Sequence, residues 1–319
     1  MATATRVKPV TDSSVAGAAS LIRTGQLVAF PTETVYGLGA DARNNRAVAR
    51  IFEAKGRPQF NPLIVHIKDL TEAHSYAVLD EGATQLAKKF WPGPLTLVLP
   101  RRSGSKISEL VSAGLDTVAL RAPAHPTACR LLELANAPIA APSANRSGNL
   151  SPTTADHVSK NLGDEVTLIL DGGPCAVGVE STIIDWSVTP PALLRPGGIA
   201  AEEIEKETGP LATPDPLTVR APGMLPNHYS PVTPVRLNAR QCQANEGLLA
   251  FGPNPVTGAK VTKNLSPTGD LVEAASNLFA MLHILDTSNC TTIATMSIPE
   301  HGLGLAVNDR LRRAASERK

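Results

Sequence analysis

Aromatic side chains are scarce in this sequence, at 3% of 319 residues, and its four cysteines include no Cys-x-x-Cys pair. Cysteines this far apart argue against a structural zinc site and against a disulfide framework, and they favour a reducing cytoplasm. An excess of one charge is also missing, because 30 Lys and Arg face 29 Asp and Glu. No general field draws the protein to nucleic acid or to an anionic membrane, so any anion site must be local.

Long hydrophobic runs and the common nucleotide motifs are missing as well. No stretch approaches the roughly 18 apolar residues of a membrane span, and the start MATATRVKPV lacks the apolar core of a signal peptide, so we expect no membrane association. The sequence contains no P-loop pattern and no G-x-S-x-G turn. GLGADA at 37–42 fits G-x-G-x-x-A, but no acidic residue follows about 20 positions later to hold a ribose. The seven histidines show no metal-ligand spacing.

Short apolar runs alternate with segments of helical periodicity in a chain that is 42% hydrophobic. The predicted strands lie at 27–30, 62–67, 95–99, 117–121, 138–142, 167–170 and 181–185. The predicted helices lie at 12–24, 45–55, 82–90, 126–136 and 153–161, the last with Thr153 or Thr154 as N-cap. Strands interleaved with helices predict an α/β fold.

Prolines crowd the segment around 210–232 and divide the chain, and periodic patterns resume after it. The expected divisions are a larger domain over 1–210, a proline-rich linker over 211–232 and a smaller α/β domain over 233–319. Helices are predicted near 269–285 and 302–316 in the smaller domain. In the last helix, we expect Arg310, Arg312 and Arg313 to form a solvated face that the helix dipole favours.

Four loops of the larger domain concentrate glycine, hydroxyl, amide and cationic side chains. KGRPQFN, at 55–61, holds Lys55 and Arg57 in a stiff turn, where two cations can grip a triphosphate. The other three loops are APSANRSGNLSP (141–152), GGPCAVGVEST (172–182) and LRPGG (194–198). Each loop taken singly is equally typical of an ordinary turn. Together, and with Arg121 at the end of another strand, they indicate one groove for a nucleotide or phosphate, without specifying a reaction.

Five ordered motifs make the chain resemble the YrdC-like family. They are FPTETVYGLGA (30–40), KGRPQFNPLIVHI (55–67), FWPGPLTLVL (90–99), APSANRSG (141–148) and GVESTIID (178–185). With the linker sequence APGMLPNHYSP at 221–231 and a further domain, the chain is similar to the long, two-domain form of that family. The resemblance implies a twisted mixed sheet with helices and a concave ligand groove, followed by a smaller Rossmann-like α/β domain.

The resemblance also implies an activity. Enzymes of this kind are nucleotidyltransferases that make L-threonylcarbamoyladenylate from L-threonine, bicarbonate or CO2, and ATP, releasing pyrophosphate. This is the first step of threonylcarbamoyladenosine formation in tRNA. The implied cofactor is Mg²⁺ held through the ATP phosphates, with no metal ligand from the protein. The implied partner is a downstream tRNA threonylcarbamoyl transferase, and direct tRNA binding is not expected.

Motif matching assigns a set of residues to each substrate. The implied ATP contacts are Lys55, Arg57, Asn61, Thr117, Ser143, Asn145, Ser151, Arg195 and the linker residue Tyr229. The implied threonine contacts are Thr34, His66, Arg121, Ala141 and Ser181. Lys55 and Arg57 are the candidate catalytic residues, because their charges would offset those of the departing pyrophosphate. Arg121 is the natural clamp for the carboxylate of threonine.

Several alternatives stay open at this point. Glu33 and Glu180 are candidate proton acceptors, although a structural role at their turns is the simpler interpretation. The linker would act as a lid if Met224 and Leu225 packed on the groove rim. A function of another class is an RNA-binding module that uses the basic groove, which the balanced charge disfavours. A carbamoyl transferase subdomain is a third possibility, disfavoured because the modules that accompany it in larger enzymes are missing.

Overall fold

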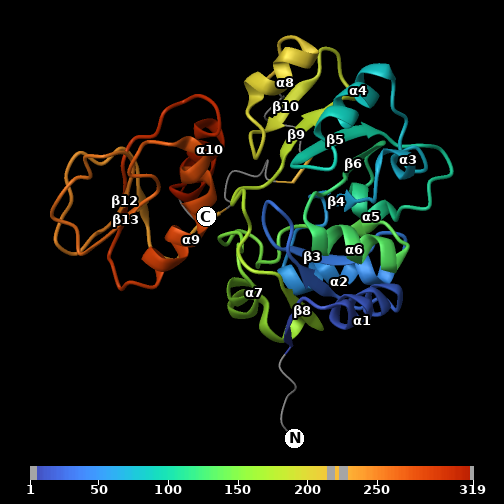
Figure 1. Ribbon diagram of the computed structural model, residues 1–319, viewed down its shortest axis with the longest axis horizontal. Coiled ribbons are helices and arrows are strands. Elements are labelled where there is room, and N and C mark those ends of the chain that lie inside the picture. Colours follow the sequence, from blue (N-terminus) through green and yellow to red (C-terminus); the bar gives the residue numbers. More distant parts are fainter. Residues whose placement is uncertain (1–5, 214–219, 223–228, 317–319) are drawn as a thin grey trace, which may run out of the picture.

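The computed structural model describes residues 6–213, 220–222 and 229–316. Figure 1 shows a larger lobe, which runs from the blue N-terminal strand to the yellow segment, and a smaller orange and red lobe beside it. Within the described residues, no helix is both long and apolar enough to cross a membrane. Met224 and Leu225, which were expected to pack on the groove rim, lie outside the described residues.

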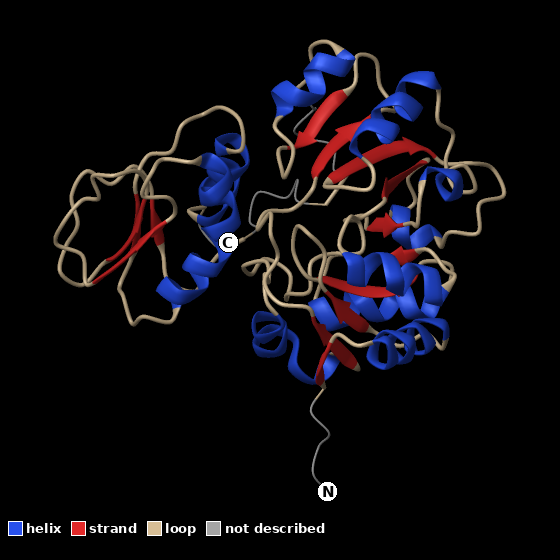
Figure 2. Cartoon of the chain, viewed as in Figure 1, coloured by secondary structure: helices blue, strands red, loops and turns tan. Residues whose placement is uncertain are grey.

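One mixed sheet forms the centre of the larger lobe (Figures 1 and 2). Its strands are β1 (Val7–Pro9), β2 (Val28–Phe30), β3 (Gly37–Asp41), β4 (Ile64–His66), β5 (Leu95–Pro100), β6 (Thr117–Arg121), β7 (Ile139–Ala140), β8 (Leu168–Asp171), β9 (Thr182–Asp185) and β10 (Ala192–Arg195). Their order across the sheet is β1-β8-β2-β3-β7-β4-β6-β5-β9-β10. Strand β3 is antiparallel to β2, whereas β4 is parallel to β6, so the sheet is mixed as the resemblance implied.

The α-helices of this lobe begin next to a capping side chain, except the last one, which follows Ala200. They are α1 (Asp12–Arg23), α2 (Asn45–Lys55), α3 (Leu70–Ala73), α4 (Glu81–Phe90), α5 (Glu109–Ser112), α6 (Pro126–Ala135), α7 (Ala155–Leu162), the 3-10 turn η1 (Gly163–Glu165) and α8 (Ala201–Thr208). Asn44 caps α2 by accepting bonds from two backbone amides of its first turn. Of the two threonines proposed for α7, Thr154 is the cap, because its hydroxyl accepts a bond from the amide of His157.

Strands β1 and β3 and helices α3, α5 and α8 were not predicted. The β3 segment is the GLGADA stretch that fits a dinucleotide pattern, and the structure gives its glycines another reason. A Cβ on Gly39 would lie 2.7 Å from the ring of Phe30 and 2.8 Å from the side chain of Ile139. Glycine therefore allows β3 to pack closely against its neighbours, and its place there does not depend on a pyrophosphate.

The smaller lobe is a parallel sheet with two helices. Its strands are β11 (Val235–Arg236), β12 (Gly247–Ala250), β13 (Val261–Asn264) and β14 (Ile293–Thr295), in the order β11-β14-β12-β13. Helices α9 (Leu271–Asp286) and α10 (Gly304–Ala314) lie on the side of this sheet that faces the larger lobe (Figure 2). The smaller lobe therefore has the α/β architecture that was expected.

The two lobes share a continuous apolar core. Buried Val35, Leu150 and Val179 of the larger lobe pack in one cluster with Tyr229 and with α9 residues such as Phe279. The ring centroids of Tyr229 and Phe279 are 5.7 Å apart. Burial of apolar surface from both sides stabilises this contact, and it fixes how α9 and α10 lie against the strand ends of the larger sheet.

The expectation that Arg310 belongs to a solvated helix face is wrong. Its side chain is 0% exposed, whereas that of Arg312 on the same helix is 54% exposed. Arg310 Nε donates to Glu180 Oε2 over 2.8 Å, and Nη1 donates to the carbonyl of Pro196 over 2.9 Å. The helix-dipole argument considers α10 alone, and packing of α10 against the larger lobe overrides it.

Candidate active site

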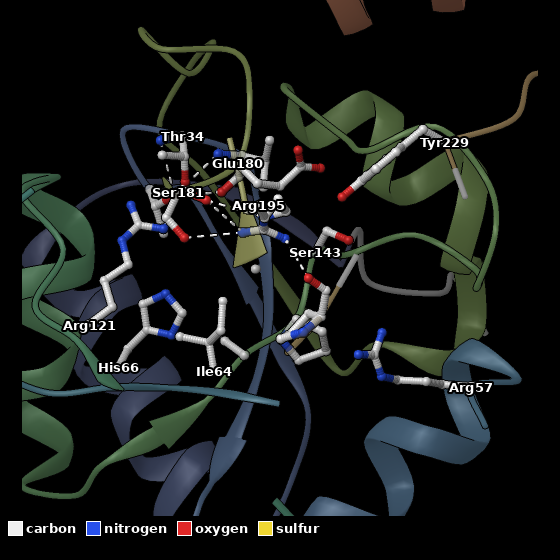
Figure 3. A pocket seen from close by; sticks show the side chains of 16 residues that line it. Thr34, Arg57, Ile64, His66, Arg121, Ser143, Glu180, Ser181, Arg195 and Tyr229 are labelled. Carbon is white, nitrogen blue, oxygen red and sulfur yellow. Dashed lines mark hydrogen bonds between the residues drawn. The ribbon is translucent and has the colours of Figure 1, made fainter. Parts of the chain in front are cut away.

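A pocket of about 500 Å³ of empty space, including the part open to solvent, lies where strand ends and loops of the larger lobe meet the linker. Its walls are Thr32, Thr34, Val35, Gly37, Arg57, Ile64, His66, Arg121, Ala141, Pro142, Ser143, Glu180, Ser181, Arg195, Pro222 and Tyr229. Figure 3 shows Arg121 and His66 on one side and Arg57 and Tyr229 on the other, with Arg195 between them. The loops predicted to build one groove therefore converge on one pocket.

Arg121 is held from three directions at the end of β6. Its Nη2 donates to Glu33 Oε1 over 2.6 Å, Nη1 donates to the hydroxyl of Thr34 over 2.9 Å, and Nε donates to the carbonyl of Gly93 over 3.2 Å. A guanidinium has five N–H groups, so two of them are left for a ligand. Burial acts to raise the pKa of Glu33, but the neighbouring Arg121 outweighs it and holds that pKa below its ordinary value.

His66 lies next to Arg121 as an uncharged imidazole. Burial, aided by the charge of Arg121, lowers the pKa of His66 to about 3. The ring packs edge-on against Phe30, and its Nδ1 has no hydrogen-bond partner within the parts of the chain that the structure describes. An unsatisfied buried nitrogen in a pocket wall suits a ligand that brings its own polar group.

Arg195 and Ser181 form the centre of the pocket. Arg195 Nη2 donates to the Ser181 carbonyl over 2.9 Å and to its hydroxyl over 3.1 Å, while Nη1 reaches the carbonyl of Pro222 over 3.4 Å. The Ser181 hydroxyl also lies 2.7 Å from that of Thr96. These bonds fix the direction of both side chains before any ligand binds.

Arg57 and Lys55 flank the opposite side, but only Arg57 lines the pocket. Arg57 donates to the carbonyls of Asn61 and Pro62 over 3.2 and 2.9 Å, and burial lowers its pKa to about 10, so it stays charged at neutral pH. Lys55 Nζ instead donates to the carbonyl of Ser143 over 2.6 Å and to that of Asn145. Lys55 therefore braces the loop that carries Ser143.

Cations in the pocket outnumber the carboxylates that bond to them. Arg57 and Arg195 are 6% and 3% exposed, and within the described ranges neither is hydrogen-bonded to a carboxylate. Burying a guanidinium that is not hydrogen-bonded to a carboxylate is costly, so the pocket is suited to an anionic ligand. The same burial disfavours the RNA-binding alternative, because these cations lie buried in one pocket and do not form an extended face.

Glu180 lies in the pocket wall, and both of its carboxylate oxygens accept hydrogen bonds. It accepts a bond from the hydroxyl of Ser151 on Oε1 and one from Arg310 on Oε2. Burial acts to raise the pKa of Glu180, and Arg310 and Arg195 outweigh it, so that pKa lies below its ordinary value. A carboxylate with a low pKa and occupied oxygens is a poor proton acceptor, so the structure favours the structural role for Glu33 and Glu180 alike.

Five of the proposed site residues do not line the pocket: Lys55, Asn61, Thr117, Asn145 and Ser151. Asn61 is fully buried, and its side-chain nitrogen and oxygen have no partner in the described part of the chain. Asn145 donates to the carbonyls of Arg146 and Asn149. Thr117 begins β6, at the opposite end of that strand from Arg121, so its contact with ATP stays a prediction.

Sequence reasoning also left pocket residues unnamed. Thr32, Val35, Gly37, Ile64 and Pro142 line the pocket and stand inside motifs that had been singled out. Thr32 is the most informative of them, because its hydroxyl lies 2.8 Å from that of Thr34 and donates to the carbonyl of Val35. The available signal was the pair of threonines in PTET, two positions apart along an extended segment.

The described residues contain no group of three or more His, Cys, Asp or Glu side chains arranged to hold a metal ion. All four cysteines are free thiols.

Comparisons with known proteins match two family models, one after the other along the chain. The family described as "Telomere recombination" (Sua5, YciO, YrdC) matches residues 20–197, and the "Threonylcarbamoyl-AMP synthase, C-terminal domain" matches residues 199–316. Threonylcarbamoyl-AMP synthase of Pyrococcus abyssi is 45% identical, over 94% of both chains. The Bacillus subtilis protein of the same name is 42% identical, over 96% of this chain and 94% of its own. The crystal structure of P. abyssi Sua5 with L-threonine superposes with a TM-score of 0.89 at 42% identity, covering 97% of this chain and 96% of that one.

Proposed function

The chain belongs to the threonylcarbamoyl-AMP synthase family, and from this premise we propose that its pocket makes L-threonylcarbamoyladenylate. The substrates are L-threonine, bicarbonate or CO2, and ATP, and pyrophosphate is released. The observation that carries the proposal is a single buried pocket with Arg121 on one side and Arg57 on the other. Threonine and ATP each bring an anionic group, a carboxylate and a triphosphate, and each would meet its own guanidinium.

Threonine binds on the Arg121 side. The two unused N–H groups of Arg121 take its carboxylate, in a guanidinium whose direction Glu33 and Thr34 have already fixed. The uncharged His66 can bond to the amine or hydroxyl without adding a second positive charge beside that amine. Ser181 and the backbone at Ala141 complete this side of the pocket.

ATP binds on the side of Arg57 and Tyr229. Arg57 and Arg195 offset the triphosphate charge, and the hydroxyl of Ser143 reaches the same space. Lys55 acts indirectly, because its hydrogen bonds to the carbonyls of Ser143 and Asn145 hold the loop that carries Ser143 in place. Asn61 follows Arg57 by four residues, and its side-chain nitrogen and oxygen, which have no partner among the described residues, would form hydrogen bonds with the nucleotide.

The chemistry is mainly positioning. Addition of the threonine amine to CO2, with loss of a proton, gives a carbamate, and a carbamate oxygen then attacks the α-phosphorus as the bond to pyrophosphate breaks. Orienting three reactants in this way can supply about 7 to 11 kcal/mol in well-aligned systems. Neither Glu33 nor Glu180 serves as the base, because each carboxylate is already bonded to an arginine.

Mg²⁺ would enter with ATP. Glu180 of the pocket lining and Glu33 beside the pocket are each bonded to an arginine, so the oxygens left in the lining are hydroxyls and backbone carbonyls, and these fit an ion held by phosphate oxygens and water. When bound, Mg²⁺ supplies charge neutralisation on the phosphates. EDTA should abolish pyrophosphate release and added Mg²⁺ should restore it, while the circular dichroism spectrum of the protein stays unchanged.

The wider setting is also part of the proposal. We assign the chain to the cytoplasm, where ATP and tRNA modification are found. We also propose that it passes its adenylate to a downstream tRNA threonylcarbamoyl transferase and does not bind tRNA itself. We keep the division into a catalytic domain over 1–210, a linker over 211–232 and a smaller domain over 233–319. The change of sheet between β10 and β11 supports it, while the two family models meet earlier, near residue 198.

Mass spectrometry of the products tests the function directly. The purified full chain is incubated with ATP, Mg²⁺, L-threonine and ¹³C-bicarbonate, and glycine replaces threonine in the control. A threonine-dependent adenylate that carries the label, formed with pyrophosphate, is expected. Absence of that species would overturn the proposal. Salt-sensitive retention of RNA on filters would then favour the binding-module alternative.

A further inference from the structure

Arg310 is the largest fully buried side chain in the described residues, and it reaches the back of the pocket from the smaller lobe. Its Nε bonds to Glu180 Oε2 over 2.8 Å, and its Nη1 bonds to the carbonyl of Pro196 over 2.9 Å. Glu180 precedes the pocket residue Ser181, and Pro196 follows the pocket residue Arg195. One guanidinium thereby joins the two loops that supply the centre of the pocket.

The same guanidinium also packs on Tyr229. Its central carbon lies 4.9 Å from the centre of the Tyr229 ring. Phe279 of α9 packs against that ring from another direction, at 5.7 Å between centroids. A buried cation is attracted to an aromatic face and restricts the plane of the ring, so Arg310 helps to fix the only tyrosine of the pocket lining within the described residues.

Close backbone packing shows that these loops have little freedom once α9 is in place. A Cβ on Gly178 would lie 2.3 Å from the backbone oxygen of Ser276 on α9. A Cβ on Gly197 would lie 2.4 Å from the carbonyl of Glu180. The smaller lobe therefore presses directly on the loop that carries Glu180 and Ser181.

Stability alone is a weak reason for such an arrangement. A buried ion pair is often no more stabilising than well-packed apolar residues of the same volume, because both charges lose their hydration. The pair instead fixes orientation, because a planar guanidinium with several partners holds each partner group at a set angle. Arg310 does not line the pocket, so it acts through Glu180, Arg195 and Tyr229.

We propose that Arg310 is a positioning residue for the nucleotide side of the reaction, through which the smaller lobe completes the pocket. This inference rests on the proposed function. It assigns the smaller lobe a part in adenylate formation: α10 holds Tyr229 and the Glu180 and Arg195 loops in the geometry that ATP needs. Ser181 of the threonine side shares the Glu180 loop, but the cation of that side is Arg121, which bonds to Glu33 and Thr34 and, among the described residues, not to Arg310.

Steady-state kinetics of Arg310→Lys tests the proposal in the full chain. Lysine keeps the charge but loses the planar fork. We expect kcat/KM for ATP to fall about 10- to 100-fold, as misplacement of about 1 Å can produce, and KM for threonine to change less than about threefold. The matched control is Arg312→Lys, on the same helix but exposed and paired with Glu300, and its kinetics should equal those of the wild type.

A double variant separates positioning from simple charge neutralisation. Arg310→Met with Glu180→Gln removes both charges of this pair at nearly constant volume, and Asp309, which also bonds to Arg310, keeps its bond to Arg313, so the fold should be retained in a thermal melt. If positioning is the role, the double variant keeps the defect with ATP. The proposal is overturned if Arg310→Lys behaves like Arg312→Lys, if the double variant regains wild-type kcat/KM for ATP, or if both substrates are affected equally. A wild-type chain that makes no labelled adenylate would instead refute the proposed function.

Discussion

Glu33 and Arg121 form a buried ion pair at the edge of the pocket, with 2.6 Å between Oε1 and Nη2. Their side chains are 13% and 4% exposed, and the second oxygen of Glu33 accepts a bond from the amide of Ala124. The pair aims the guanidinium before a substrate arrives, and a residue locked by its neighbours binds with less loss of conformational entropy. The threonine side of the pocket is therefore largely preformed.

Arg121→Ala should raise KM for threonine far more than KM for ATP. The guanidinium is the cation of the threonine side, and a charge-assisted hydrogen bond contributes about 1.5–3 kcal/mol, which corresponds to a roughly 10- to 100-fold change. Initial rates of pyrophosphate release, measured against each substrate in turn, give the two constants. Glu33→Gln is the control, because it keeps the guanidinium and should weaken threonine binding much less. Equal changes in both KM values for Arg121→Ala would contradict a carboxylate clamp.

Arg57→Ala should sharply reduce threonine-dependent pyrophosphate release and leave the fold intact. Arg57 lines the ATP side and bonds within the chain only to the carbonyls of Asn61 and Pro62, among the described residues. The far-ultraviolet circular dichroism spectrum should match that of the wild type. Arg46→Ala, on the exposed surface of the preceding helix, serves as the control and should keep full activity. Unchanged turnover in Arg57→Ala would remove this residue from the mechanism.

Lowering the pH from neutral should first reduce the free energy of unfolding because His66 is held uncharged in the folded chain. The pKa of His66 is about 3 in the folded chain against an ordinary 6.5, so between these values the unfolded chain binds more protons and stability falls as the pH falls. From pH 6.5 to 5 this amounts to about 2 kcal/mol for His66 alone. Glu33 and Glu180, whose pKa values lie below the ordinary 4.5, add their loss only at lower pH.

Urea unfolding at several pH values measures this effect. His66→Gln should show a shallower dependence of the unfolding free energy on pH between 6.5 and 5 than the wild type, whatever its stability at pH 7. His301→Gln, at an exposed position, should keep the wild-type slope. Identical slopes for all three proteins would show that His66 is not buried in its neutral form.

Gly178→Ala should destabilise the contact between the lobes. Gly178 has a φ of +73°, and a Cβ there would clash with the backbone of Ser276. Backbone strain at positive φ costs about 1–3 kcal/mol, and the clash adds to it, because backbone atoms of a helix cannot move aside. Gly173→Ala is the matched control, with a φ of +81° and open space around its Cβ position. A lower melting temperature than that of Gly173→Ala is expected, and equal melting temperatures would contradict the packing argument.

Much of the fold follows from local sequence patterns. The helix predicted at 45–55 is α2, and the strand predicted at 117–121 is β6, because an amphipathic period with a good cap and a β-branched buried run are both short-range signals. Short β1 and the glycine-rich β3 carry no such short-range signal and were missed. Their conformation depends on neighbouring strands, and glycine has no strand preference of its own.

The residue types of the site were also readable from the sequence. Nine proposed residues line the pocket, namely Thr34, Arg57, His66, Arg121, Ala141, Ser143, Ser181, Arg195 and Tyr229. The sequence did not indicate the side-chain directions of Lys55 and Ser151, because their hydrogen-bond partners lie 88 and 29 positions away along the chain. A hydrogen-bond partner at that separation is set by packing and leaves no local pattern.

The sequence by itself determined the α/β class, the strand-end loops and the balanced charge that confines anion binding to one place. Only the tertiary structure decided which cations face the pocket and which stand behind it. Arg310 shows the reason most clearly. In an isolated helix an arginine faces water, whereas packing of α10 against the larger lobe removes that water and leaves Glu180 and Asp309 as the carboxylate partners of Arg310.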